Sequence, residues 1–277
     1  MKYSLNAFMY SSCPAWVPAY PLKDTIERIA RLGYDALELG AVAPHAWPYY
    51  LDAAKRQEIN GWLRDNNIVV SSILANPGGG PGANPASAVK EEREWTVQHL
   101  KDVCDLGIDL DCTMLLYVTG WYIYGTKRQE AWNYSLESLV EVGRYAAEKG
   151  ANVCIEPTPD GHNLVETADD ALLMMEQSGL SNVSVMFDTT HAFYRNEPSS
   201  DYIYKMGQNL KHTHFADYGR MPPGTAGADF VPIMQALKDI DYQGYITMEL
   251  FPERKIAPDT FGRQAIENLK RIEAELK

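Results

Sequence analysis

Four acidic or imidazole side chains lie at or near the ends of apolar segments in the second half of the sequence. The segments are NVCIEP, VSVMFD, KHTHFAD and YITMELF, and the side chains are those of Glu156, Asp188, His214 and Glu249. Each segment has the length and composition of a buried strand. Three carboxylates brought together would repel one another and raise each other's pKa unless a cation neutralised them. We therefore expect these residues to form a cation site if the fold brings them together.

The residue types in this set indicate which cation it would hold. Two glutamates, one aspartate and one histidine offer mostly oxygen ligands with a single imidazole. Such a set suits Mn²⁺, Mg²⁺ or Co²⁺ better than the thiolate-rich sites of structural zinc. The four cysteines are scattered and form no C-x-x-C pair, and a reduced, buried thiol is expected for Cys112 and Cys154.

Short apolar runs alternate with amphipathic segments along the whole sequence. Strands are predicted at 3–8, 34–40, 68–75, 112–118, 152–157, 183–188, 211–217 and 245–251. Helices are predicted at 22–32, 52–65, 86–106, 131–149, 167–178, 198–208, 229–240 and 259–275. Strict alternation implies parallel strands joined by helical crossovers. An open doubly wound sheet is the rival, but no G-x-G-x-x-G or G-x-x-x-x-G-K-[ST] motif follows a strand. We predict a single (β/α)8 barrel (TIM barrel) domain over residues 1–277.

In such a barrel the carboxyl ends of all strands point to one face, so the four side chains should converge there. Their separations of 32, 26 and 35 residues each match about one strand–helix unit. His191, three residues after Asp188, would then reach over the site. Trp121 and Tyr122 follow the fourth strand and are candidates for a pocket wall, although helix packing or a subunit interface would explain them as well.

Two further polar residues lie inside predicted strands. His212 shares a face with His214 and is interpreted as a hydrogen-bonded residue of the barrel interior. Glu38 is either directed toward the site or part of a buried structural pair, and it is left out of the catalytic set.

Composition excludes several classes of function. Twenty-five Lys and Arg against 37 Asp and Glu give a net charge of −12, which argues against nucleic acid as a partner. The N-terminal segment has no apolar run of signal-peptide length, and no window approaches the length of a membrane span. We expect a cytoplasmic protein.

Four motifs resemble those of the xylose-isomerase-like barrel superfamily, especially its ketose 3-epimerases and fructoselysine 3-epimerases. They are IEPTPDGHN, VMFDTTH, HTHFADYGR and TMEL, and LGYDALELGAVAPHAW resembles the fructoselysine branch. The resemblance implies that Glu156, Asp188, His214 and Glu249 hold one divalent metal ion, with Mn²⁺ expected and Co²⁺ or Mg²⁺ as alternatives. It also implies a homo-oligomer, a dimer or a tetramer.

The same resemblance suggests substrate contacts. His191 and Arg220 occupy positions that contact substrate oxygens in the family. His162 stands where ketose 3-epimerases typically have a second glutamate, and GRMPPGTAGADF lacks their G-E-N-N-R run. These departures argue against a simple free ketohexose as the substrate.

The implied activity is C3 epimerisation of a ketose or ketose derivative through a metal-stabilised enediolate. Glu156 and Glu249 would come from non-adjacent strands and flank the substrate, one removing the C3 proton and the other delivering a proton to the opposite face. Proton transfer between neighbouring carbons by one base would give aldose–ketose isomerisation instead.

Several related activities are alternatives within or near the superfamily. An inosose-type dehydratase would use the same proton abstraction, and the barrel subunit of a carbon-glycoside-cleaving lyase complex would need a partner chain. The apurinic endonuclease of this fold needs more histidines at strand ends than this sequence has. A non-catalytic sugar-binding protein would not need two opposed carboxylates on a metal.

Overall fold

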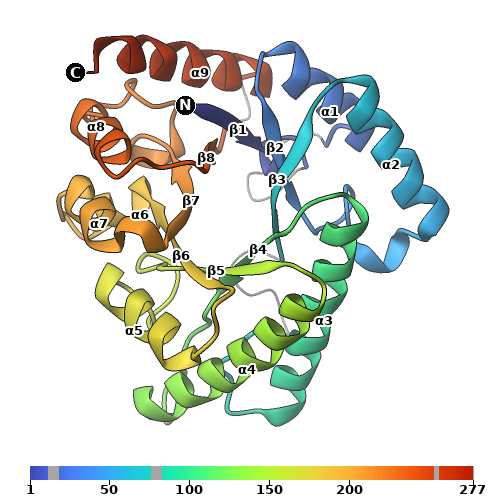
Figure 1. Cartoon of the computed structure of the whole chain (residues 1–277), viewed down its shortest axis with the longest axis vertical. Coiled ribbons are helices and arrows are strands. Elements are labelled where there is room, and N and C mark those ends of the chain that lie inside the picture. The colour runs from blue at the N-terminus through green and yellow to red at the C-terminus, as the bar shows by residue number, and fades with distance from the viewer. Residues whose placement is uncertain (12–18, 76–82, 253–255, 277) are drawn as a thin grey trace.

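Eight parallel strands form a closed barrel in the order in which they occur along the chain (Figure 1). The computed structural model describes residues 1–11, 19–75, 83–252 and 256–276. Its strands are Lys2–Asn6 (β1), Ala36–Gly40 (β2), Val69–Leu74 (β3), Met114–Val118 (β4), Asn152–Glu156 (β5), Val183–Asp188 (β6), Leu210–Phe215 (β7) and Tyr245–Met248 (β8). The closing pair is β1 with β8, which places Ser4 beside Thr247. The predicted (β/α)8 barrel is confirmed.

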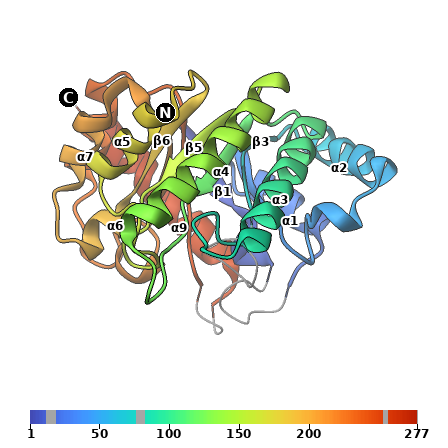
Figure 2. The same cartoon turned by 90° about the horizontal axis from the view of Figure 1, so that it is seen from below.

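Helices cover the outside of the ring of strands (Figures 1 and 2). The α-helices of the described ranges are Leu22–Arg31 (α1), Ala53–Asp65 (α2), Lys90–Asp109 (α3), Arg128–Glu148 (α4), Ala168–Ser178 (α5), Thr189–Tyr194 (α6), Ser199–Met206 (α7), Val231–Asp239 (α8) and Pro258–Glu275 (α9). All eight predicted helices are found with small shifts at their ends, and α6 was not predicted. None of the helices in the described ranges is long and apolar enough to cross a membrane.

Local signals explain where several helices begin and end. Thr167 precedes α5 and accepts a hydrogen bond from the backbone of Asp170, whose carboxylate accepts from the backbone of Thr167 in return. This capping box satisfies backbone N–H groups that a helix start otherwise leaves unpaired. The same helix ends at Gly179, whose φ of 64° is a left-handed conformation that costs glycine little.

Two kinds of side chain are buried apart from the main core. One set is a separate apolar cluster formed by Phe8, Val42, Leu74, Leu116, Cys154 and Met186. The other set is a buried polar network formed by Ser4, Asn6, Glu38, Ser72, His212 and His214. Apolar residues on the outer side of the strands pack instead against the helices in the main core. The polar network is therefore the part of the interior from which chemistry can be built.

The cysteines of the described ranges are free and buried, as predicted for Cys112 and Cys154; they are Cys104, Cys112 and Cys154. Burial raises the pKa of Cys154 to about 12, which keeps this thiol protonated at neutral pH. Cys13 lies outside the described residues.

Candidate metal centre and active site

The four residues expected to form a cation site lie together at the carboxyl ends of their strands. Glu156 and Asp188 are the last residues of β5 and β6, His214 lies in β7, and Glu249 directly follows β8. One ligand atom from each residue lies within 4.8 Å of the others, and all four side chains are buried. Such a set of three carboxylates and one imidazole can hold a divalent cation.

The imidazole of His214 is shared between this cluster and the barrel interior. Its Nδ1 atom lies 3.3 Å from Glu249 Oε2 and 3.5 Å from Glu156 Oε1, while its Nε2 atom lies 2.9 Å from Glu38 Oε1. Within the described part of the chain, this buried Nδ1 atom has no hydrogen-bond partner. A buried nitrogen facing carboxylate oxygens without a hydrogen bond is the arrangement that a metal ion would complete. The donor set therefore fits a divalent cation.

Electrostatics hold the cluster in its charged form. Burial alone would raise the pKa of Glu156, but His191 and His214 outweigh that effect and lower it. Burial alone would lower the pKa of His214, but Glu38 and Glu249 raise it well above its ordinary value. The carboxylates of Glu156 and Asp188, whose pKa values are both lowered, are thus ionised and able to bind a cation, which would displace a proton from the imidazole.

Asp188 has a different partner on each of its two carboxylate oxygens. Its Oδ1 atom accepts hydrogen bonds from the backbone N–H and the hydroxyl of Thr190, at 2.7 and 2.8 Å, and so caps α6. Its Oδ2 atom faces Arg220 and His191. The hydroxyl of Thr189 bonds to both backbone groups of Ala216, which ties the ends of β6 and β7 together. Asp188 is therefore held in place while one oxygen stays available to the site.

Arg220 provides a fixed cation beside the carboxylates. Its Nη1 atom lies 2.7 Å from Asp188 Oδ2 and 2.5 Å from Glu249 Oε2. Its backbone has a φ of 60°, a conformation that costs a non-glycine residue free energy, and its carbonyl accepts from the backbone N–H of Phe251. Asp217 accepts four hydrogen bonds from backbone N–H groups of the same loop. The loop is thus built to hold this guanidinium at the site.

His191 lies beside the cluster, on the short helix α6. Its Nε2 atom is 3.6 Å from Glu156 Oε1 and 3.6 Å from Asp188 Oδ2, and its Nδ1 atom is 2.7 Å from Asp160 Oδ1. Burial alone would lower the pKa of His191, but Asp188, Asp160 and Glu156 raise it to about 10. Asp160 was not among the predicted site residues, although it lies in the motif IEPTPDGHN.

The predicted aromatic wall lies on the loops that follow β4 and β5. The rings of Trp121 and His162 are 5.4 Å apart and tilted by 35°. Tyr122 is half-buried against the main core, and its backbone exchanges two hydrogen bonds with the side chain of Asn163. Trp121 and His162 therefore form a ring pair near the mouth, whereas the packing of Tyr122 favours a structural role. Asp160 and His162 lie on the same loop, which connects this ring pair to the contact with His191.

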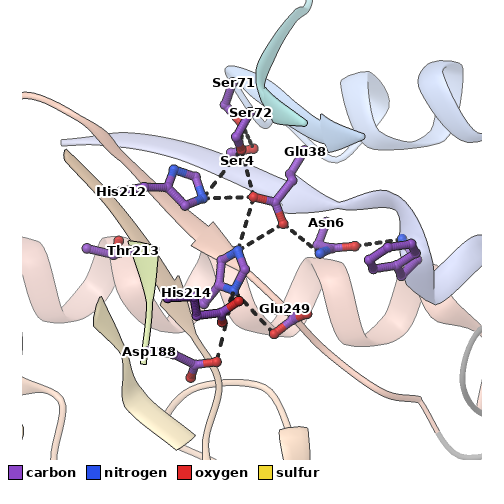
Figure 3. A network of polar contacts seen from close by, with 12 residues as sticks. Ser4, Asn6, Glu38, Ser71, Ser72, Asp188, His212, Thr213, His214 and Glu249 are labelled. Atoms are coloured by element: carbon purple, nitrogen blue, oxygen red, sulfur yellow. Dashed lines mark hydrogen bonds and ion pairs between the residues drawn. The ribbon is translucent and has the colours of Figure 1, made fainter. Parts of the chain in front are cut away.

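Glu38, which was left out of the predicted catalytic set, contacts His214 on the side of the imidazole that faces away from Asp188 and Glu249 (Figure 3). His212 donates to the same carboxylate at 2.8 Å, which agrees with its interpretation as a hydrogen-bonded interior residue. Glu38 itself is fully buried. Burial alone would raise its pKa, but His214 and His212 lower it, so the carboxylate is ionised.

Two features define the class of protein to which this chain belongs. They are the closed barrel of eight strands and the buried cluster of three carboxylates and one histidine at the carboxyl ends of those strands. Residues 26–272 match the model of the xylose isomerase-like TIM barrel family, and the chain belongs to that family. The resemblance noted in the sequence is thereby confirmed.

Similar proteins include sugar epimerases. The chain is 31% identical to the D-psicose 3-epimerase of Ruminiclostridium cellulolyticum over 235 residues, which cover 82% of this chain and 77% of the relative. It is 24% identical to the fructoselysine 3-epimerase of Escherichia coli O157:H7 over 262 residues, which cover 91% and 94%. A crystal structure of D-psicose 3-epimerase with D-tagatose from Clostridium cellulolyticum superposes with a TM-score of 0.85 at 24% identity over the whole of both chains, a likeness of fold.

Proposed function

We propose that this protein is a divalent-metal-dependent sugar epimerase that inverts C3 of a ketose or ketose derivative. The observation that carries the proposal is the convergence of Glu156, Asp188, His214 and Glu249, with ligand atoms within 4.8 Å of one another. Relatives named as D-psicose and fructoselysine 3-epimerases support the reaction type. Mn²⁺ is the ion we propose, with Co²⁺ or Mg²⁺ as alternatives.

Two carboxylates of the cluster are suited to move a proton on opposite faces of one carbon. Glu156 ends β5 and Glu249 follows β8, and two strands of the closed barrel, β6 and β7, lie between them. One carboxylate removes the C3 proton and the other returns a proton to the opposite face. A bound divalent ion would supply a Lewis acid that stabilises the enediolate left when the proton departs.

The cationic side chains around the cluster position the substrate. Arg220 and His191 already lie against the carboxylates, and both carry N–H donors that can reach sugar oxygens. The ring of Trp121 offers an apolar surface for the C–H face of a sugar, beside His162. We propose that a substituent of the ketose extends toward this ring pair, since one relative is named as a fructoselysine 3-epimerase.

Product analysis tests the proposed function. Purified protein loaded with Mn²⁺ is incubated with free ketoses, phosphorylated ketoses and ketose–amine conjugates such as fructoselysine, with and without a chelator. We expect one class to give a C3 epimer of unchanged mass, and the chelator to abolish its formation. A product lighter by one water would indicate a dehydratase, and an aldose product an isomerase. No conversion by the metal-loaded protein would contradict the proposal.

A further inference from the structure

Glu38 is the centre of a buried hydrogen-bond network that reaches the proposed metal centre through His214 (Figure 3). Its Oε1 atom accepts from Asn6 Nδ2 at 2.6 Å. Its Oε2 atom accepts from Ser72 Oγ at 2.7 Å and from His212 Nε2 at 2.8 Å. The Nε2 atom of His214 lies 2.9 Å from one carboxylate oxygen and 3.0 Å from the other. The carboxylate therefore has donors from four side chains on three other strands.

The chemistry of a carboxylate fixes the direction of each of these hydrogen bonds. An ionised carboxylate can only accept, so both histidines present an Nε2–H group to Glu38. A neutral imidazole carries a single proton, and placing it on Nε2 leaves the lone pair of Nδ1 unprotonated. In His214 that Nδ1 atom faces Glu156, Asp188 and Glu249.

We propose that Glu38 is a positioning residue that selects the Nε2–H tautomer of His214 and aims Nδ1 at the metal ion. This inference rests on the metal centre of the proposed function. Glu38 acts through His214, and no contact joins it to the three carboxylates across the imidazole within the described residues. A carboxylate that accepts from the far nitrogen of a metal-binding histidine also makes the metal-facing nitrogen a better electron donor.

The presence of an apolar cluster in the same fold argues against a purely structural role for Glu38. That cluster includes Phe8, Leu116 and Met186, so buried positions on these strands can be packed without charge. A buried carboxylate carries a large desolvation cost, and apolar residues of similar volume often stabilise a fold as well or better. A buried charge at Glu38 is explained if His214 needs a partner that can only accept hydrogen bonds.

The substitution Glu38→Gln tests the tautomer without changing the size of the side chain. An amide offers one acceptor and one donor, so its NH₂ group must face either Asn6 Nδ2 or the donors now bonded to Oε2. If the NH₂ group faces His214, the imidazole must change tautomer, so that Nε2 accepts and Nδ1 carries the proton. Nδ1 is the nitrogen that would bind the metal ion. We expect Mn²⁺ to bind 10- to 100-fold more weakly, on the order observed for such partners of metal-binding histidines.

Two control variants separate this effect from general disturbance of the interior. Thr247→Val changes a fully buried side chain two residues before Glu249. The hydroxyl of Thr247 has no hydrogen-bond partner among the described residues. Its affinity for Mn²⁺ should stay within about twofold of the wild type, since no hydrogen bond is lost. Ser72→Ala removes one donor from Glu38 but neither histidine, so its loss should be smaller than that of Glu38→Gln.

The experiment measures the dissociation constant of Mn²⁺ by competition with a chelator, for the wild type and the three variants, with thermal unfolding of the metal-free proteins as the check of folding. A 10- to 100-fold loss confined to Glu38→Gln supports the inference. Equal affinity in Glu38→Gln and the wild type overturns it and leaves the proposed function intact. A wild-type protein that binds no divalent ion removes the proposed function as well.

A second measurement tests the tautomer of His214 directly if Glu38→Gln does not fold. In the wild type loaded with Mg²⁺, which is diamagnetic, long-range ¹H–¹⁵N NMR spectra show which ring nitrogen of His214 carries the proton. We expect a protonated Nε2 and an unprotonated Nδ1. A proton on Nδ1 would overturn the inference.

Discussion

The Nδ1 atom of His191 lies 2.7 Å from a carboxylate oxygen of Asp160, which comes from the loop after β5. This contact orients the imidazole so that Nε2 faces Glu156 and Asp188, at 3.6 Å from each. Asp160 is itself partly exposed, with 39% of its side chain accessible, so it contributes to the orientation of His191 more than to the stability of the fold.

Substituting Asp160 should therefore affect turnover rather than metal binding. In Asp160→Asn we expect kcat to fall about 10- to 100-fold, because His191 is proposed to contact the substrate and loss of a defined orientation is costly for such a group. Affinity for Mn²⁺ should be unchanged within error. Asp169→Asn is the matched control, since Asp169 pairs with Lys205 on the surface. Wild-type kcat in Asp160→Asn would show that His191 needs no such partner.

Arg220 should oppose metal binding while it favours substrate binding. Its guanidinium occupies the same carboxylate oxygens of Asp188 and Glu249 that face the proposed ion. Two like charges about 4 Å apart repel by roughly 1–4 kcal/mol in water or near a protein surface. In Arg220→Met we therefore expect Mn²⁺ to bind about tenfold more tightly or better, while KM for the sugar rises.

Titration of metal-free protein with Mn²⁺ measures the predicted gain in metal affinity of Arg220→Met. Steady-state kinetics measures the predicted rise in KM. The control is Arg195→Met, because the guanidinium of Arg195 pairs with Glu197 and Glu166 outside the cluster. Weaker metal binding in Arg220→Met would mean that the arginine supports the site rather than competing for it.

Removing the metal should lower the thermal stability of the protein. An ion that binds the folded state at 100 times its dissociation constant adds about 2.7 kcal/mol to the free energy of unfolding. For chains somewhat smaller than this one, each kcal/mol shifts Tm by roughly 2–4 °C, so saturating Mn²⁺ should raise Tm by about 5 °C or more. Acidification should weaken the effect, because protons compete for the same carboxylates and imidazole.

Differential scanning calorimetry of chelator-treated and metal-loaded protein measures this shift in Tm. Asp188→Asn loses a charged ligand, so Mn²⁺ should raise its Tm only slightly. A shift of wild-type size in Asp188→Asn would place the ion elsewhere.

The two proposed proton-transfer residues should be needed for turnover but not for folding. In Glu156→Gln and Glu249→Gln we expect kcat to fall by roughly 10²–10⁴, the contribution typical of a general acid or base. Both variants keep the side-chain volume, and circular dichroism should match that of the wild type. Metal content must be measured in parallel, since both glutamates are also proposed ligands. Near-wild-type turnover in either variant, with metal bound, would contradict the two-base scheme.

The strand ends made much of this site predictable from the sequence. Glu156 and Asp188 follow apolar runs directly, and the barrel then requires their ends to meet on one face. Glu38 was harder to interpret because every residue of β2 is buried, so no polar alternation marks the inward-facing positions.

Local loop geometry escaped prediction for a different reason. The helix α6 has only six residues, and its start depends on a cap by Asp188 that the sequence shows only as an acid after a strand. The contact between Asp160 and His191 joins the loop after β5 to helix α6, and the conformation of that loop is set by tertiary contacts rather than by sequence periodicity.

Hydrogen exchange at C3 of the substrate is the first measurement to make on the proposed epimerisation. Mn²⁺-loaded protein is incubated in D₂O with the panel of ketoses and ketose conjugates, and deuterium at C1 and C3 is followed by NMR with and without a chelator. We expect deuterium at C3 together with a new C3 epimer, both abolished by the chelator. No metal-dependent exchange at C3 with any member of the panel, in protein shown to hold its metal ion, would contradict it.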